Sequence, residues 1–322
     1  MLSKSILSTL LYHSVFDYPL TVNEIHRYLI SEKAVLPSPL KKEIGLLVKS
    51  KKIISNNNLL IPRFQIHDSR FMISFRLRRQ KISAEKMIIA KLASNAISMI
   101  PWVKMIAVTG ALAMENADNN DDIDLMVVTS RNCLWIVRPL AILLVSLFFK
   151  RRYPLPNAET NPPADAWSVS DWRAGNQQPI INNNAICLNL WLDESALEIP
   201  VDQRNLYTAH ELAQMKPVVN KEKTYEKILI QNRWGKKFLA NFWQSSLRVP
   251  PRRGVAIPLG SFTSFRMTAG NFLNSFLFHL QFIYMKSKMT NERVSLHSAF
   301  FHPGNRTDTI LGRYDSLRHR YF

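Results

Sequence analysis

The sequence predicts an α+β fold in three parts: an N-terminal helical segment that ends in a hairpin, a central α/β core with a mixed sheet, and a helical C-terminal domain. Apolar residues recur at helical spacing over residues 4–17. Residues 105–108 form a short apolar run, and residues 122–128 alternate between polar and apolar, as strands do. With 322 residues and 47% hydrophobic content, the chain can bury a large core in two or three domains.

Two capping signals divide the N-terminal segment into helices. Thr21 and, three residues later, Glu24 form a capping box for a helix over residues 22–30. Ser38, which precedes a proline, is the expected N-cap of another helix over residues 40–49. Together with the first helix, these signals predict three short helices.

A predicted hairpin follows the helices. Residues 53–54 and 59–62 are apolar, and the asparagines at 56–58 between them are typical turn residues. Three helices and a β-wing make a winged helix-turn-helix over residues 1–63. Lysines on the last helix and at the start of the wing lie where such domains contact phosphates: Lys41, Lys42, Lys49, Lys51 and Lys52. Residues 41–52 therefore predict contact with nucleic acid, with a protein-contact module as the alternative.

The charge of the chain is unevenly distributed. The net charge is +18, with basic residues concentrated in 41–91 and 216–322, whereas residues 104–215 are acidic overall. Such a field attracts polyanions, whether nucleic acid, a nucleotide or an anionic membrane surface. Solubility alone is the plainer explanation of the basic charge.

Composition excludes several classes of protein. Cys133 and Cys187 are the only cysteines, so neither a disulfide framework nor a zinc site is supported, and we expect a reducing, cytoplasmic compartment. The N-terminal apolar stretch lacks a small-residue cleavage site and suits an amphipathic helix better than a signal peptide.

A second apolar segment predicts a helix that begins at Asn132 and ends near Phe149. Its uninterrupted apolar part, residues 139–149, is shorter than the roughly 20 residues that span a bilayer. We expect a buried helix behind the sheet and no membrane partner. The basic residues 150–152 leave attachment to a membrane surface as a weaker alternative.

Residues 104–129 read as strand, glycine turn, polar loop and strand. Gly110 ends the first strand, where a residue without a Cβ lets the backbone turn and approach a ligand. The alternation of the second strand places Asp122 and Asp124 on one face. Two neighbouring carboxylates stay ionised together when a hard cation such as Mg²⁺ lies between them. A solvated loop in which Asp122 caps the strand is the alternative.

This order of elements resembles the core motif of the DNA polymerase β-like nucleotidyltransferase superfamily, in which a Gly-Ser turn precedes a strand with two aspartates. The resemblance implies that the turn, Thr109, Gly110 and Ala111, holds the triphosphate of an NTP, expected to be ATP. It also implies that Asp122 and Asp124 bind Mg²⁺. Ala111 stands where the superfamily usually has Ser, which leaves only backbone N–H groups for the phosphates.

The superfamily takes a third carboxylate from a neighbouring strand, here predicted over residues 185–193. Strict alternation puts Cys187, Asn189, Trp191 and Asp193 on one face of that strand. Asn189 is the best positional match, but an amide cannot deprotonate an attacking hydroxyl. Asp193 is the second candidate, with an ordinary acid at the strand end as the alternative.

The predicted nucleotidyltransferase core covers residues 104–216 and follows a helical linker over residues 64–103. It includes an irregular excursion over residues 153–184, a lid or a mobile loop, and a capped helix over residues 202–215. The segment LYTAHELAQMKP in that helix is similar to uncharacterised bacterial proteins that join a winged helix to a nucleotidyltransferase-like domain. His210 beside Glu211 is expected to be structural.

Residues 217–322 form the predicted helical C-terminal domain. Its expected elements are a helix over residues 221–245, an aromatic-rich core or docking helix over 271–285, and a basic helical tail packed on the body. We therefore expect a Mg²⁺-dependent nucleotidyltransferase with an unidentified acceptor hydroxyl. The alternative is a catalytically impaired nucleotide-binding regulatory protein that contacts nucleic acid through the winged helix.

Overall fold

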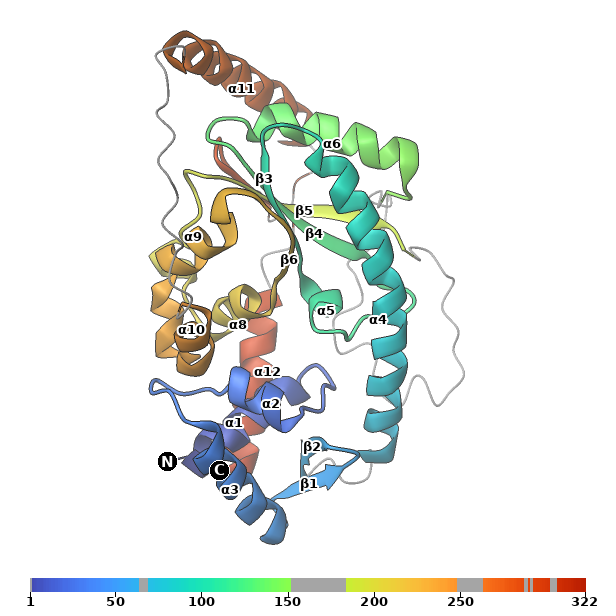
Figure 1. The fold of residues 1–322 in the computed structure, drawn as a ribbon, viewed down its shortest axis with the longest axis vertical. Helices are drawn as coiled ribbons and strands as arrows, with labels where there is room; N and C mark the ends of the chain where they lie inside the picture. The colour runs from blue at the N-terminus through green and yellow to red at the C-terminus, as the bar shows by residue number, and fades with distance from the viewer. Residues whose placement is uncertain are drawn as a thin grey trace.

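A six-stranded mixed sheet forms the centre of the protein (Figure 1). The structure, a computed structural model, describes residues 2–63, 69–151, 184–247, 263–286, 289, 292–301 and 306–322. The strand order is β6-β3-β4-β5-β8-β7, in which β4 and β5 pair in parallel and the other pairs are antiparallel. The strands are β3 (Val103–Val108), β4 (Ile123–Thr129), β5 (Ile186–Asp193), β6 (Lys216–Asn220), β7 (Arg293–Val294) and β8 (Ser298–Phe300). The predicted α+β class is confirmed.

The N-terminal segment folds into three helices and a hairpin, as predicted: α1 (Leu2–Ser14), α2 (Val22–Arg27), α3 (Pro37–Lys49), β1 (Ile53–Asn56) and β2 (Leu59–Pro62). The capping box of Thr21 and Glu24 is present. Asn57 and Asn58 both adopt positive φ, at 50° and 61°, which is the conformation of a type I′ hairpin turn. Ser38 is not the N-cap of α3: the helix already begins at Pro37, whose fixed φ suits a first helical position.

The long helix α4 (Ser69–Ser98) connects the hairpin to the sheet. Ala90, Ala93 and Ile97 are completely buried in the core cluster that contains β3 and β4. Figure 1 shows α4 running beside the sheet from the N-terminal helices to β3. The predicted helical linker is therefore also a covering layer of the sheet.

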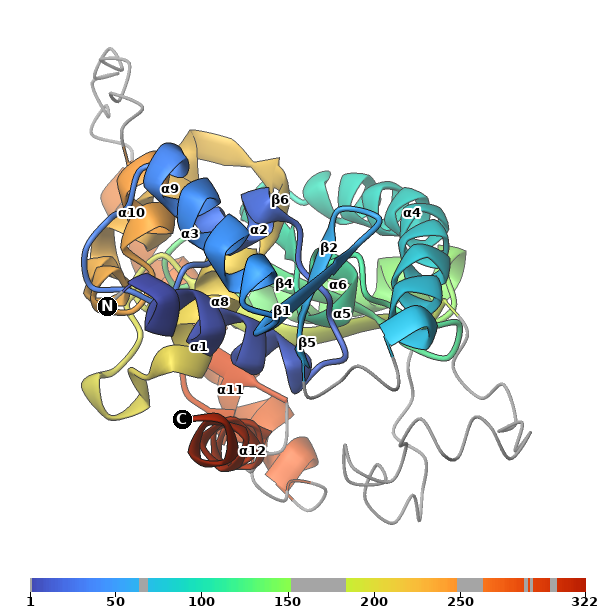
Figure 2. The same cartoon turned by 90° about the horizontal axis from the view of Figure 1, so that it is seen from below.

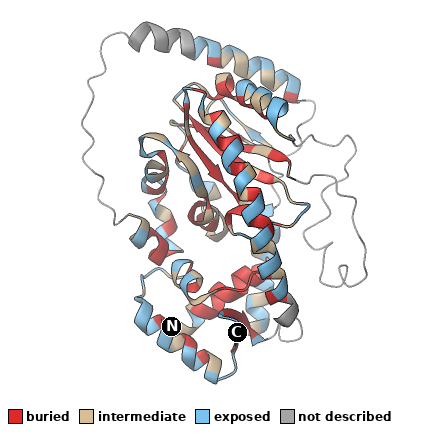
Figure 3. Ribbon diagram, turned by 45° about the vertical axis from the view of Figure 1, so that its right-hand side comes forward, coloured by how far each residue is buried: buried red, intermediate tan, exposed pale blue. Residues whose placement is uncertain are grey.

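Each face of the sheet carries its own core. On one face α4 and α6 (Leu134–Phe148) pack against Ile123, Leu125 and Val127, and α11 (Thr263–Lys286) packs on α6. On the other, α8 (Leu206–Gln214), α9 (Thr224–Gln231) and α10 (Ala240–Ser246) pack against Met126 and Val128. Figure 3 shows the buried strands between these layers.

Two predicted helices have different bounds. The helix expected from residue 202 is a short 3-10 turn, Val201–Gln203, followed by α8, which Asn205 caps. The helix expected over residues 221–245 is divided into Lys221–Lys223, α9, Arg233–Lys237 and α10. Buried Asn232 ends α9, because its side chain bonds the backbone of Leu197, Ile228 and Ile199.

Helix α6 differs from its prediction in start and in burial. Cys133 is its N-cap position, and Asn132, with a φ of 58°, lies before the helix. Only one side of α6 is buried, since Leu143, Leu147 and Phe148 are exposed. Within the described ranges, no helix combines the length and apolar character that crossing a membrane requires. The predicted excursion at residues 153–184 lies outside the described residues, apart from Asn184.

The C-terminal helix α12 (Arg306–Tyr321) packs on α1 and α8, as expected for a tail on the body. It brings the two chain ends to the same end of the molecule, as the view from below shows (Figure 2). The sheet, however, does not end at residue 216. Strands β6, β7 and β8 come from the part predicted as a helical domain and add to both sides of the sheet.

Candidate functional site

The turn after β3 lies directly against the Asp124 side chain. Gly110 has a φ of +63°, and a Cβ added there would lie 2.8 Å from Asp124 Oδ2. The N–H of Thr109 donates to the Asp124 carbonyl oxygen at 3.1 Å. Ala111 is the second residue of the short helix α5 (Gly110–Ala113) that follows. Only glycine combines this backbone conformation with so close a contact.

Asp122 and Asp124 flank Ile123, the first residue of β4. Ile123 is completely buried among the side chains beneath α4 and α6, whereas both aspartates are half-buried. Because side chains alternate along a strand, Asp124 lies on the opposite side of β4 from Ile123. The glycine turn thus lies beside Asp124, and Asp122 is the residue that leads into the strand.

Asn189 reaches the same site through a β-bulge in β5. Asp124 pairs with Cys187 and Leu125 with Leu188, but Met126 pairs with Leu190, so Asn189 is the extra residue. Its Nδ2 donates to Asp124 Oδ1 at 2.6 Å, and the residue is only 2% exposed. Asn189, the predicted positional match for the third carboxylate, therefore contacts Asp124 directly through a hydrogen bond.

The bulge also reverses the alternation of β5. Beyond it, Leu190 and Leu192 pack with Met126, whereas Trp191 lies in the opposite core. The prediction that strict alternation places Asp193 on the face of Asn189 is wrong, because one extra residue shifts the phase of the strand.

Asp193 lies at the far end of β5, paired with Thr129 at the end of β4. Its buried carboxylate accepts bonds from the N–H of Asn132 at 3.0 Å, the N–H of Ser195 at 2.7 Å and His297 Nδ1 at 2.8 Å. These bonds join the start of α6 and the β7–β8 connection to β5. Asp193 is thus placed as an acid of the strand end, away from Asp122 and Asp124.

Lys86 of α4 holds the polar loop that precedes Asp122. Its side chain is buried, and Nζ donates to the carbonyl oxygens of Asn119 at 3.1 Å and Asp121 at 2.7 Å and to Asn184 Oδ1 at 3.2 Å. Burial lowers the pKa of Lys86, and the charges of Asp121, Asp122 and Asp118 oppose that shift. The loop is therefore tied to α4.

The role of Lys86 was missed in the sequence analysis, although its spacing along α4 indicates it. The residue occupies a position of the stripe that α4 buries, together with Ser83, Ala90 and Ala93. A lysine in such a stripe needs buried acceptors, because an uncompensated ammonium group is costly inside a protein. The position of Lys86 in the helical repeat therefore predicts that a polar group of another element accepts its hydrogen bonds.

Helix α8 carries a further acid, Glu211, and lies on the other face of the sheet from α4 and α6. Tyr207 and Glu211, one turn apart, are joined by a side-chain hydrogen bond. Burial, then the charge of Glu211, raises the pKa of Tyr207 well above its usual range, and Asp124 adds to this shift. Burial also raises the pKa of Glu211, against the opposing charge of Arg306.

His210, between these two residues, is structural, as expected. It is completely buried and stacks on Tyr12 of α1 with ring centroids 4.0 Å apart. Its Nδ1 lies 2.9 Å from the carbonyl oxygen of Leu206. Burial and the neighbouring His13 lower the pKa of His210, which keeps the imidazole neutral. It therefore holds α1 against α8.

The donor atoms at this site suit a hard cation. Asp122, Asp124 and the Asn189 amide offer oxygen, the donor that Mg²⁺ prefers. Among residues with described positions, no group of three or more His, Cys, Asp or Glu side chains is arranged to hold a metal ion. Two carboxylates are nevertheless enough for Mg²⁺, which commonly completes its coordination with water and substrate phosphates.

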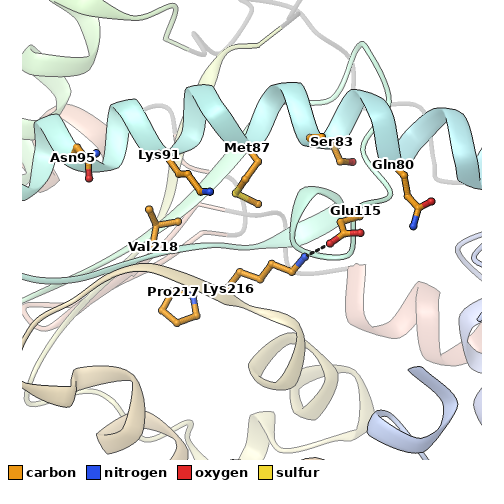
Figure 4. A pocket seen from close by; sticks show the side chains of 10 residues that line it. Gln80, Ser83, Met87, Lys91, Asn95, Glu115, Lys216, Pro217 and Val218 are labelled. Carbon is orange, nitrogen blue, oxygen red and sulfur yellow. Dashed lines mark hydrogen bonds and ion pairs between the residues drawn. The ribbon is translucent and has the colours of Figure 1, made fainter. Parts of the chain in front are cut away.

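A separate hollow of about 660 Å³ lies between α4 and β6 (Figure 4). Its walls carry Ser83, Met87 and Lys91 of α4 on one side and Lys216 and Val218 on the other. None of the predicted site residues lines it. The hollow is thus distinct from the aspartate pair.

Comparison of the chain with known protein families, with curated proteins and with solved structures gives no match.

Proposed function

We propose that the protein is a Mg²⁺-dependent nucleotidyltransferase that moves a nucleotidyl group from an NTP, expected to be ATP, to an acceptor hydroxyl. The contact between the Gly110 turn and Asp124 carries the proposal. A Cβ at residue 110 would lie 2.8 Å from Asp124 Oδ2, so a glycine is required where the turn passes the Asp124 carboxylate. Phosphate binding and cation binding would then occur side by side.

Each residue of the site has a part in this proposal. Asp122 and Asp124 would hold Mg²⁺, which supplies positive charge against the charge that develops on the leaving pyrophosphate. The backbone N–H groups of Gly110 and Ala111 bind the triphosphate, and Thr109 fixes the turn to β4 through its 3.1 Å bond. Lys86 orients the loop before Asp122.

The acceptor hydroxyl must lose a proton, and β5 supplies no carboxylate for that step. Asn189 instead orients Asp124 through the 2.6 Å hydrogen bond. Glu211 is the acid of α8; its side chain is hydrogen-bonded to Tyr207, and the charge of Asp124 adds to the raised pKa of Tyr207. Burial raises the pKa of Glu211, which makes its carboxylate a stronger base, so we take the Tyr207–Glu211 pair as the candidate proton acceptor.

Asp122→Asn and Asp124→Asn test the site. Each change removes one carboxylate but keeps the shape of the side chain, so we expect Mg²⁺-dependent ATP binding to be abolished while the fold is retained. Isothermal titration calorimetry with and without Mg²⁺ measures the binding, and circular dichroism checks the fold. Asp202→Asn, which changes a 71% exposed acid, is the matched control and should bind as the wild type does. Equal affinity in all four proteins would overturn the site.

The second candidate is a catalytically impaired nucleotide-binding regulator that contacts nucleic acid through a winged helix over residues 1–63. Two observations favour it: an amide stands beside Asp124 where a third carboxylate is expected, and the lysines of residues 41–52 are all exposed. Mass spectrometry after incubation of the same proteins with NTPs, Mg²⁺ and cell lysate separates the two candidates. Transferred nucleotide supports the enzyme, whereas NTP binding without transfer supports the regulator.

A further inference from the structure

The helix pair α6 and α11 turns its polar residues inward. Asn274 Oδ1 accepts the N–H of Trp135 at 2.8 Å, and Gln281 Nε2 donates to the Trp135 carbonyl oxygen at 2.9 Å. Arg138 donates to Gln281 Oε1 at 2.9 Å, and the rings of Trp135 and Phe278 lie 5.1 Å apart. These contacts fix the rotation of α11 about its axis.

The outward side of α11 is consequently apolar. Its residues at helical spacing are between 46% and 76% exposed: Phe272, Leu273, Phe276, Leu280, Ile283 and Tyr284. Helix α6 adds Leu140, Leu143, Leu147 and Phe148, between 41% and 71% exposed. Both helices lie at the end of the molecule opposite the chain ends (Figure 1). We call these exposed side chains the α6–α11 surface.

The charged side chains of α6 and α11 themselves are all basic. Neither α6 nor α11 contains an acidic residue. Lys150 follows α6 and Lys286 ends α11, and both are exposed. An apolar helix face with aromatic and aliphatic side chains, bordered by cations, is the composition that lies in the headgroup region of an anionic bilayer.

We propose that the α6–α11 surface binds the surface of an anionic membrane, with both helices lying in the interface. The apolar side chains enter the boundary between headgroups and acyl chains, and the lysines contact the phosphates. The chemistry favours anionic lipid over an acidic protein because apolar residues dominate the patch, and the cations stand only at its border. This binding is independent of nucleotide transfer at Asp122 and Asp124.

Sedimentation with lipid vesicles tests the proposal. The full chain is mixed with vesicles of phosphatidylcholine alone or with added phosphatidylserine, and we expect tighter binding to the anionic vesicles. Phe272→Ser, Phe276→Ser and Ile283→Ser combined should weaken binding by more than about tenfold, since each side chain contributes burial in the interface. Lys150→Glu with Lys286→Glu should remove the preference for phosphatidylserine.

The matched control changes exposed apolar residues elsewhere. Leu36→Ser, Leu46→Ser and Met99→Ser alter side chains that are 71%, 51% and 80% exposed, and this triple variant should bind vesicles as the wild type does. Thermal melts check that each variant folds. Absence of vesicle binding overturns the proposal, as does an equal loss in both triple variants. A dimer in analytical ultracentrifugation that only the α11 triple variant abolishes, without vesicle binding, would show that a second copy covers the surface.

Discussion

Gly110 determines how closely the turn can approach Asp124. Alanine at this position faces two costs: left-handed backbone is unfavourable by roughly 1–2 kcal/mol for a residue with a Cβ, and the added carbon meets Asp124 Oδ2. We expect Gly110→Ala to lower the free energy of unfolding by at least about 1 kcal/mol and to weaken ATP binding. Urea denaturation and calorimetry measure the two effects.

Gly45→Ala is the matched control for this change. Gly45 lies inside α3, and nothing lies within 4 Å of an added Cβ. Alanine there should stabilise the protein by roughly 0.5–1 kcal/mol and leave ATP binding unchanged. The interpretation of the turn is wrong if both substitutions act alike.

Glu211 makes the free energy of unfolding depend on pH. The residue is partly exposed but its carboxyl group lies inside the protein, and this burial raises the pKa of the group in the folded protein, so folding favours the protonated form. As the pH rises above the unfolded pKa of about 4.3, the unfolded state loses its proton first, and the wild type is progressively destabilised. Glu211→Gln removes this effect.

The unfolding free energy of Glu211→Gln should therefore match the wild type at low pH and exceed it near neutral pH. Denaturation at a series of pH values measures the difference. A constant difference between wild type and Glu211→Gln at every pH would mean that Glu211 does not titrate differently in the folded state.

At the scale of elements, α3 and the hairpin present the exposed lysines of residues 41–52. If they contact phosphates, nucleic-acid affinity should fall as the salt concentration rises. Lys41→Ala with Lys42→Ala should then reduce the slope of log affinity against log salt concentration by about 1 to 2 units. Fluorescence anisotropy with a labelled duplex at several salt concentrations measures this slope. Lys236→Ala with Lys237→Ala is the control pair. An unchanged slope, or no binding at low salt, would leave this segment as a protein-contact module.

The elements that the sequence predicted well depend on neighbouring residues. The capping box at Thr21, the asparagine turn at 57–58 and the positive φ of Gly110 each follow from a local pattern. The bulge at Asn189 does not, because it depends on how β5 aligns with β4. The glycine turn beside Asp124 could thus be predicted, whereas the position of Asp193 could not.

At the scale of the whole molecule, the sheet joins strands that are far apart in the sequence. Strand β6 pairs with β3, and β8 pairs with β5, although both follow the predicted core. Short strands such as Ser298–Phe300 carry too little alternation to be recognised, and their partners are set by long-range contacts. The predicted boundary at residue 216 therefore differs from the observed sheet.

The late position of β8 and α12 has a consequence for synthesis on the ribosome. Strand β5 gains its antiparallel neighbour only when residues 298–300 emerge, and α12 covers α1 only after residue 306. Until then the nascent chain exposes the unpaired edge of β5 and an apolar surface of α1. Chains that stop before residue 298 are accordingly the forms most prone to aggregate or to be captured by chaperones.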